Sequence, residues 1–277
     1  MTSFAPFWHA ATRTLAGGVV VLLGTACGGP AAPAGDPAAL AAHRSPRTWE
    51  RLPGPGLERW RDPRTGIVFV RIPAGSFVSG AAEAPRTVRI TKDFLLAETE
   101  WTVEQWRRAA ALAGLAAVPV PEGPGTLPMP LSFVDAEAAC QKLGYRLPTE
   151  GEWERACRAD HSGADAPWSS PAKVREHAWY NANAGDGARP VATRAPNGFG
   201  LYDVFGNLWE WCSDFHGPLL PSAEVVVDPQ GPQQGQTHAL RGGSWFTGPI
   251  VGPETRTTEF SVTRSAVYGA RPACDLP

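Results

Sequence analysis

The sequence lacks an excess of charge, a long apolar run and the histidine patterns of common metal sites. Its 277 residues carry 25 Lys and Arg against 27 Asp and Glu, so we expect no nucleic-acid partner. The apolar run Leu15–Leu23 is shorter than the roughly 20 residues of a transmembrane helix. The six histidines show neither HxxxH nor HExxH spacing, and the tyrosines and carboxylates show no recognisable nucleophile–base pair.

Cysteine is scarce and its count is odd, because one of the five, Cys27, follows the N-terminal apolar run. A short apolar core that ends in small residues is typical of a signal peptide, which we assign to residues 1–26. Gly24-Thr25-Ala26 before Cys27 is similar to a bacterial lipobox, with Gly24 in place of the usual Leu, and it also fits ordinary secretory cleavage. We therefore expect export, either as a lipoprotein anchored to the membrane of the bacterial cell envelope through lipidation of Cys27 or as a secreted protein.

Glycine and proline are abundant, with 30 and 28 residues. Both residues break helices, so the chain is predicted to be turn-rich with short elements. The sequence is 43% hydrophobic and contains 11 tryptophans, which is enough for a packed core. We predict an Ala/Gly/Pro-rich tether over residues 27–64 and a folded domain over residues 65–277.

The first part of that domain has the pattern of short strands. Apolar, β-branched and alternating runs predict strands over residues 66–72, 76–80 and 87–91. After residue 158 the regular pattern fades, and Asn, Gly, Asp and Pro dominate as far as Leu201. A loop of this length usually requires a metal or a function to hold it.

Three helices are predicted from their caps. Thr102 is expected to cap the first, and Ser132 the second, which ends at Gly144. Thr149, followed three residues later by Glu152, is a capping box and starts the third helix.

A set of motifs in the folded domain resembles one known family. The segment Asn197–Asp214, with Arg146–Ala156 before it and Leu240–Trp245 after it, is similar in order and spacing to the formylglycine-generating enzymes, the sulfatase-modifying-factor domains. Weaker similarities lie at residues 72–77, 98–106 and 269–271, so that the resemblance covers about residues 66–275. It implies an α+β, C-type-lectin-like formylglycine-generating-enzyme fold that is loop-rich with little regular secondary structure.

The resemblance breaks down at the oxidation site. Active members oxidise a substrate cysteine with copper(I), held by two cysteine thiolates shortly after the Gly-Gly-Ser motif, and soft thiolates suit this soft ion. In this chain Thr247 and Gly252 stand at those two positions. Trp209 and Ser244 match residues that line the family's oxygen pocket. The resemblance therefore implies a pocket that keeps part of its walls and binds no copper.

Family members also hold calcium, through carboxylates, Asn side chains and backbone carbonyls, which are the hard oxygen ligands that Ca²⁺ prefers. By resemblance, a first structural site falls on Asp203 and Glu210 with the carbonyls of Gly206 and Leu208. The other reading is that Asp203 and Glu210 only cap turns. A second site, in a loop shorter than the family's, would use the following residues: Asn183, Ala184, Asp186 and Ala188.

Four cysteines remain after Cys27, an even number that favours disulfides in an exported protein. Resemblance to the eukaryotic members implies a pair between Cys140 and Cys274. The family partner of Cys157 is missing, which leaves Cys212 as its candidate. Buried free thiols, or a reactive or metal-binding pair of Cys157 and Cys212, are the alternatives.

Two functions fit these features. The first is a non-catalytic module that binds a protein or glycan through the surface around residues 241–271, which is a ligand-binding face in related proteins. The second is an exported oxidase or protein-modifying enzyme of the same family with a different metal site. The missing thiolates favour the first function, and the retained Trp209 and Ser244 keep the second open.

Overall fold

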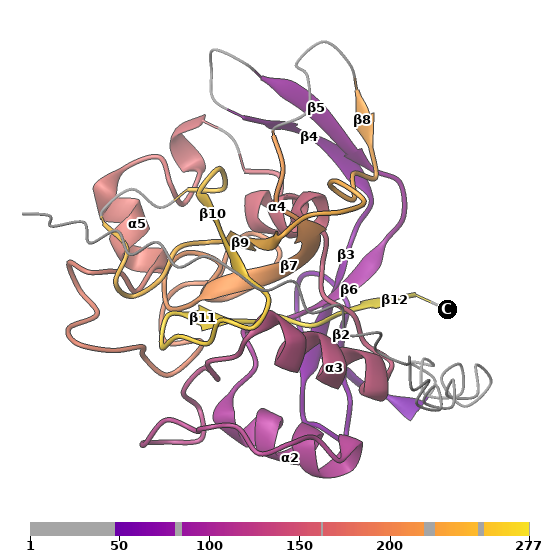
Figure 1. Ribbon diagram of the computed structural model, residues 1–277. Helices are drawn as coiled ribbons and strands as arrows, with labels where there is room; N and C mark the ends of the chain where they lie inside the picture. Colours follow the sequence, from indigo (N-terminus) through magenta and orange to yellow (C-terminus); the bar gives the residue numbers. More distant parts are fainter. Residues whose placement is uncertain (1–47, 81–84, 162, 219–224, 249–251, 277) are drawn as a thin grey trace, which may run out of the picture. The chain divides into compact units, whose positions relative to one another are not determined.

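The computed structural model describes residues 48–80, 85–161, 163–218, 225–248 and 252–276 (Figure 1). Within these residues the strands form three small sheets, and the helices are short. The motif-bearing segments connect these elements as long irregular loops, as expected for a loop-rich α+β domain. No helix among the described residues is long and apolar enough to cross a bilayer.

The largest sheet joins the two ends of the described chain. Its strand order is β1-β2-β3-β6-β12, and all its pairs are antiparallel. The C-terminal strand β12 therefore lies beside β6, which belongs to the first half of the sequence (Figure 1). The strands are β1 (Glu50–Leu52), β2 (Arg59–Arg61), β3 (Val68–Ile72), β6 (Phe94–Ala97) and β12 (Ala273–Asp275).

Two smaller sheets carry the remaining strands. In the four-stranded sheet the order is β10-β9-β7-β11, with β11 parallel to β7 and an irregularity in the β7–β9 register between Trp211 and Phe215. In the three-stranded sheet the order is β4-β5-β8, with β8 parallel to β5. Their strands are β7 (Trp209–Phe215), β9 (Thr237–Arg241), β10 (Arg256–Phe260), β11 (Tyr268–Gly269), β4 (Gly75–Ser79), β5 (Arg86–Ile90) and β8 (Val226–Val227).

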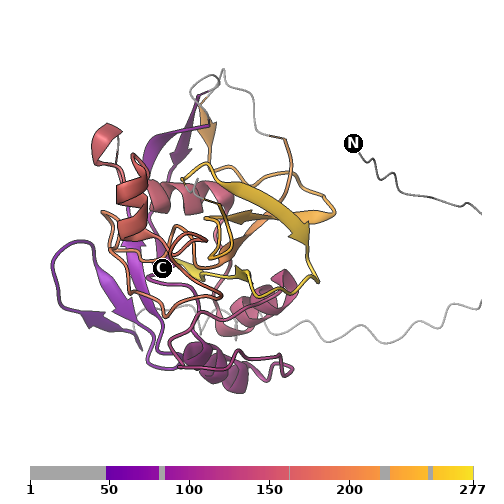
Figure 2. The ribbon, with the colours of Figure 1, turned by 90° about the vertical axis from the view of Figure 1, so that its left-hand side faces the viewer.

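The three predicted caps are confirmed. Helix α2 (Val103–Ala113) begins after Thr102, α3 (Phe133–Leu143) after Ser132 and α4 (Glu150–Arg158) after Thr149. Each cap accepts a hydrogen bond from the third helical residue, whose side chain bonds back to the cap, so every one is a complete capping box. Gly144 ends α3 in the left-handed conformation that glycine favours. In both views the β4–β5 hairpin and α2 lie at opposite ends of the domain (Figures 1 and 2).

One helix was not predicted. Helix α5 (Pro171–His177) and a short 3₁₀ turn (Gly163–Asp165) lie in the stretch that was expected to be loop throughout. Ser170 caps α5 and Pro171 stands at its first position, which is a standard start signal. The prediction missed it because the seven residues that follow have no clear apolar period.

The tether prediction is wrong for residues 48–64. Strands β1 and β2 lie in this range and extend the large sheet from β3. Trp49 is buried, and its ring stacks on Phe69 at 4.8 Å between centroids. The sequence did not predict these strands, because strands of only three residues between Gly and Pro are too short to show an alternation of apolar and polar residues. Residues 1–47, which include the predicted signal peptide and Cys27, lie outside the described residues.

Two groups of buried side chains form the core. One surrounds α2 and α3, with Trp101, Trp106 and Trp211, and the other lies under α4, with Trp153 and Phe205. The indole Nε1 of Trp211 donates to the carbonyl of Leu131, so this buried ring also satisfies its polar atom. The long loops pack onto these groups and bring the family motifs together.

Candidate functional site

The motif around β7 surrounds a buried ion pair. Glu210 on β7 is 1% exposed, and it accepts hydrogen bonds from Nε and Nη2 of Arg271, at 2.9 and 2.7 Å. The indole Nε1 of Trp153 on α4 donates to the same carboxylate at 2.7 Å. Arg271 is fully buried and also donates to the carbonyls of Ala97 and Tyr202. This one side chain ties the large sheet to the loop before β7.

Two further carboxylates are buried beside this pair. Glu100 accepts hydrogen bonds from the backbone N–H of Leu208 at 3.1 Å and from Nδ2 of Asn207 at 3.3 Å. Asp203 accepts a bond from the backbone N–H of Ala192 at 2.7 Å through Oδ2. Burial raises the pKa of Asp203 to about 6. Burial, together with the charges of Asp203 and Glu210, raises the pKa of Glu100 well above its usual value.

Glu100, Asp203 and Glu210 form an acidic cluster that is the candidate cation site, in which both oxygens of Glu210 already accept hydrogen bonds from Arg271. It contains three carboxylates, and only Arg271 among the described residues is a basic group hydrogen-bonded to one of them. Oδ1 of Asp203 is buried and, within the described structure, has no hydrogen-bond partner. A divalent ion would balance the excess charge and satisfy this oxygen, and oxygen ligands suit Ca²⁺. Among the described residues, no three Asp, Glu, His or Cys side chains converge on one point in a way that could hold a metal ion, so backbone carbonyls would have to complete the site.

The residues of the second expected calcium site do not fit an ion. The amide of Asn183 is used within its own turn, since Oδ1 accepts from Tyr180 N and Nδ2 donates to Ala178 O. The carbonyl of Ala184 accepts the Nε–H of Arg189 at 2.6 Å, which places a positive group against an expected ligand. Asp186 is exposed, and Ala188 is half-buried.

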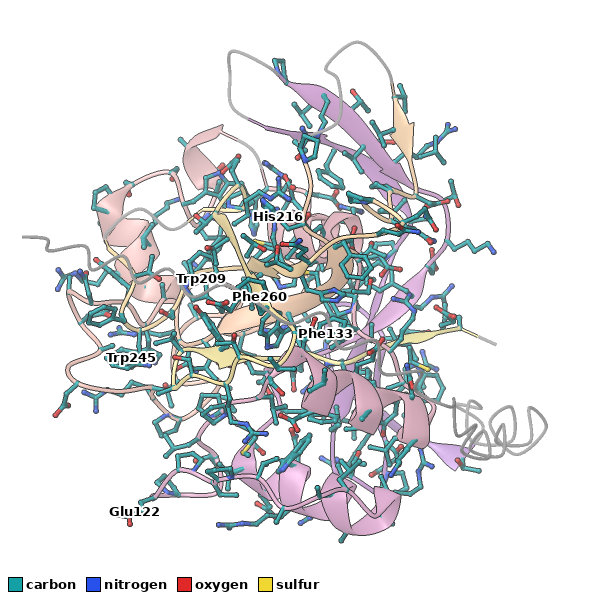
Figure 3. All side chains as sticks on the ribbon, in the orientation of Figure 1. Glu122, Phe133, Trp209, His216, Trp245 and Phe260 are labelled. Carbon is teal, nitrogen blue, oxygen red and sulfur yellow. The ribbon has the colours of Figure 1, made fainter. Side chains whose placement is uncertain are left out.

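At the oxidation site, Ser244 and Thr247 lie together in a tight turn. Oγ1 of Thr247 accepts the backbone N–H of Ser244 at 2.8 Å and lies 3.2 Å from its Oγ. Gly252 is buried, and its N–H donates to the hydroxyl of Thr255 at 3.0 Å. Trp209 is half-buried at the start of β7 (Figure 3). The residue expected at the position of the first thiolate is therefore a hydroxyl engaged in a local turn, and the residue expected at the second has no side chain.

The expected disulfides are not present. Cys140, Cys157, Cys212 and Cys274 are all buried, and Cys140, Cys157 and Cys212 carry free thiols. The sulfur atoms face backbone carbonyls instead, with Cys212 Sγ 4.0 Å from Glu210 O and Cys274 Sγ 3.4 Å from Asp275 O. Burial raises the pKa of the Cys140, Cys157 and Cys212 thiols, which keeps them protonated and unreactive. This corrects both expected pairings.

The sequence missed several residues that shape these sites. Glu100 belongs to the acidic cluster but lies more than a hundred residues from the motif that it contacts. Two cavities, of about 850 Å³ and about 220 Å³, also had no sequence signal. Their walls include no residue of the expected oxidation site, and the acidic cluster contributes to neither.

The sequence matches a known protein family over most of its length. Residues 60–275 match the model of the family described as the sulfatase-modifying factor enzyme 1-like domain. The chain belongs to this family. It is 35% identical over 196 residues to the formylglycine-generating enzyme of Thermomonospora curvata, covering 62% of this chain and 61% of that protein. It is also 35% identical over 144 residues to the inactive Cα-formylglycine-generating enzyme 2 of Mus musculus, covering 46% and 42% of the two chains.

Solved structures confirm the fold of this sulfatase-modifying-factor domain. Treponema denticola variable protein 1 superposes with a TM-score of 0.67 at 24% identity, over 82% of this chain and 99% of that one. PvdO from Pseudomonas aeruginosa superposes with a TM-score of 0.65 at 22% identity, over 81% and 100%. The chain spans less than two thirds of the length of the curated enzymes it matches.

Proposed function

We propose that this sulfatase-modifying-factor domain is an exported, lipid-anchored module that binds a protein or glycan partner and does not oxidise cysteine. The observation that carries the proposal is the turn at Ser244–Thr247. Copper(I) chemistry needs soft thiolates, and here one position offers a hydroxyl already bonded to Ser244 N and the other is Gly252. The family contains both enzymes and a protein described as inactive, so loss of the chemistry on this fold has a precedent.

The exposed apolar side chains after β9 and β10 support a binding role. Phe246 is 72% exposed, Phe260 is 54% exposed and Val262 is 76% exposed. Phe246 follows the Gly-Gly-Ser motif, and the other two lie at and just beyond the end of β10, an edge strand (Figure 3). Large exposed apolar residues near an unpaired strand edge are typical of interaction surfaces. They lie within residues 241–271, the expected ligand-binding face.

Loss of oxidase activity is tested directly with the full chain. The protein is incubated with Cu(I) and a Cys-x-Pro-x-Arg peptide, and the peptide is followed by mass spectrometry. The Thermomonospora curvata relative serves as the positive control. We expect the peptide mass to stay unchanged with this protein. Conversion of the thiol to an aldehyde would overturn the proposal and favour an oxidase with a different metal site.

Lipid anchoring at Cys27 is tested by fractionation. The wild-type chain is expected in the membrane fraction, and a Cys27→Ser variant in the soluble exported fraction, because the variant has no thiol to acylate. Cys157→Ser is the matched control, since this buried thiol plays no part in anchoring. A Cys27→Ser protein that stays in the membrane fraction would contradict the anchor.

We further propose that the acidic cluster holds a structural calcium ion through Asp203 and Glu210, with the carbonyls of Gly206 and Leu208. The ion would supply the positive charge that three buried carboxylates and one guanidinium lack. Glu100 would orient the loop through Leu208 N, and Arg271 would hold Glu210 in place. Ca²⁺ then stabilises the native state by linkage, about 2.7 kcal/mol at a hundredfold excess over its dissociation constant.

The calcium proposal predicts a melting temperature that rises with Ca²⁺ and falls with chelator. Asp203→Ala removes the unpaired oxygen and should abolish the response, whereas Asp203→Asn keeps one oxygen ligand and should weaken it. Asp186→Asn is the matched control, because this exposed residue belongs to the site that does not fit an ion. Identical melting curves of the wild type with calcium and with chelator would refute the site.

A further inference from the structure

Two arginines lie against one tryptophan ring in the loop that follows α5 (Figure 1). The Cζ atom of Arg194 is 3.7 Å from the centroid of the Trp179 ring, and the Cζ atom of Arg189 is 5.9 Å from it. A guanidinium over an aromatic face is attracted by the electrons of the ring, and its planar shape suits this stacking. We call these three side chains, of Trp179, Arg189 and Arg194, the Arg–Trp patch.

Neighbouring groups hold the Arg–Trp patch in place. The indole Nε1 of Trp179 donates to Oγ1 of Thr193 at 2.9 Å, and Nε of Arg189 donates to the carbonyl of Ala184 at 2.6 Å. A Cβ at Gly185 would lie 2.6 Å from Nη2 of Arg189, so this guanidinium rests against backbone that requires a glycine. A ligand would therefore meet side chains that are already ordered, which lowers the entropy lost on binding.

The outer donors of both guanidiniums are free. Most other described arginines pair with a carboxylate, but Arg189 and Arg194 form no ion pair with any described residue. Their Nη atoms also have no hydrogen-bond partner in that part of the chain, and none of these atoms is buried there without a partner, so they reach solvent. Only Nε of Arg194 is buried. The patch therefore presents two positive charges through their Nη groups.

These donors fit the carboxylates of an acidic peptide. The Nη–H groups of a guanidinium match the two oxygens of a carboxylate, and such charge-assisted bonds are stronger than neutral ones. A sugar ring would need an open aromatic face, and Arg194 covers one face of Trp179. Arginine and tryptophan are also the residue types enriched at the centres of protein–protein interfaces. The patch therefore favours a protein partner over a glycan.

The patch borders the expected ligand-binding face. The backbone N–H of Asn207 donates to the carbonyl of Trp179 at 2.7 Å, and the N–H of Trp245 donates to the carbonyl of Asn207 at 2.8 Å. Two backbone hydrogen bonds thus join the patch to the turn that carries the exposed Phe246, whose ring lies 5.6 Å from that of Trp245. The patch adds positive charge beside the exposed apolar side chains of that face.

We propose that the Arg–Trp patch docks an acidic segment of a partner protein, whose carboxylates pair with the Nη groups of Arg189 and Arg194. The inference deepens the proposed function, on which it rests, because it states the chemistry of the partner. Its test measures binding, whereas the peptide-oxidation assay measures catalysis. Oxidation of the cysteine peptide would refute the proposed function and leave a binding result unchanged, so the two can fail separately.

The test measures binding of short labelled peptides to the full chain by fluorescence anisotropy. The probes are a tetraglutamate peptide and a tetraglutamine peptide, which has the same shape without the charge. We expect saturable binding of tetraglutamate that weakens as salt is added, and no binding of tetraglutamine. Oligogalacturonate, an acidic saccharide, is used as a competitor and should compete about tenfold less well than unlabelled tetraglutamate.

Variants locate the binding. Arg194→Ala and Arg189→Ala should each weaken tetraglutamate binding by about tenfold, because each removes charge-assisted hydrogen bonds to a carboxylate. Arg194→Lys keeps the charge but loses the planar fork and should weaken binding as well. Arg107→Ala is the matched control, since Arg107 is exposed on α2 and forms no ion pair with a described residue, and this variant should bind like the wild type.

Three results would overturn the proposal. The first is the absence of saturable tetraglutamate binding, and the second is equal binding by wild type and Arg194→Ala, or an equal loss in Arg107→Ala. The third is tighter competition by oligogalacturonate than by tetraglutamate, which would assign the patch to an acidic glycan. If Arg194→Ala fails to fold, Arg194→Lys and Arg189→Ala decide in its place.

Discussion

Buried charged side chains link segments of this domain that are far apart in the sequence. Arg271 and Glu210 are almost fully inaccessible, and each makes bonds to groups far away in sequence. Removing one partner of such a pair costs about 3–5 kcal/mol, because the other charge stays buried without compensation. The exposed pair of Arg51 and Glu58, by contrast, is expected to add less than about 1 kcal/mol. Arg271 and Glu210 therefore hold the motif-bearing loops to the core of the domain.

Asp214 makes the stability of the domain depend on pH. It is 3% exposed, and burial raises its pKa from 3.8 to about 6. Between these values the native state binds more protons than the unfolded state, so this group's contribution falls as the pH rises, by about 3 kcal/mol in all. In Asp214→Asn we expect that fall to disappear. Urea unfolding from pH 4 to 7 measures the difference between the two proteins, and parallel profiles would contradict the assignment.

The short helix α4 contributes Trp153 to the acidic cluster and lines the smaller cavity. Its capping box holds Thr149 and Glu152, and Glu152 also pairs with Arg146. Glu150 and Glu154, on the same helix, face the smaller cavity. An isolated helix of nine residues is unstable, so its cap and its tertiary contacts must hold it.

Loss of the α4 cap should therefore be measurable. Thr149→Ala removes the acceptor for Glu152 N and should lower the free energy of unfolding by about 1 kcal/mol. Thr149→Ser keeps the hydroxyl and serves as the control, with a loss of no more than a few tenths. Chemical denaturation of the three proteins provides the measurement. Equal losses in both variants would show that packing of the threonine methyl, not the cap, is responsible.

At the scale of elements, the sequence was most informative where the signal is local. The caps at Thr102, Ser132 and Thr149 each depend on residues three apart, and all three were predicted as caps, with Thr149 also predicted as a capping box. The contact of Glu100 with Asn207 joins residues 107 positions apart, and no local pattern encodes it. Strands β1 and β2 were missed for the same reason, because three-residue strands are stabilised by their neighbours in the sheet.

At the level of the whole molecule, the folded domain begins before residue 65, the boundary predicted from composition. Substitution of Trp49 tests this. Trp49 packs on Phe69 and Tyr145 between the first strand and the core. Trp49→Ala should lower the free energy of unfolding by about 3–5 kcal/mol, as for other buried aromatic residues. Phe246→Ala, at an exposed aromatic, should change it by less than about 0.5 kcal/mol. A Trp49→Ala protein as stable as wild type would place these residues outside the folded unit.

The sequence by itself determined the family, the fold class and the helix caps, and it predicts that Thr247 and Gly252 stand where active relatives have copper-binding thiolates. Each of these depends on the identity of single residues or on residues that are a few positions apart in the sequence. Only the tertiary structure decided that Cys140, Cys157 and Cys212 are buried thiols, that Glu100 joins Asp203 and Glu210, and that a cavity of about 220 Å³ lies beside α4. The physical reason is that burial and long-range pairing depend on the path of the chain, which brings together residues that no local pattern connects.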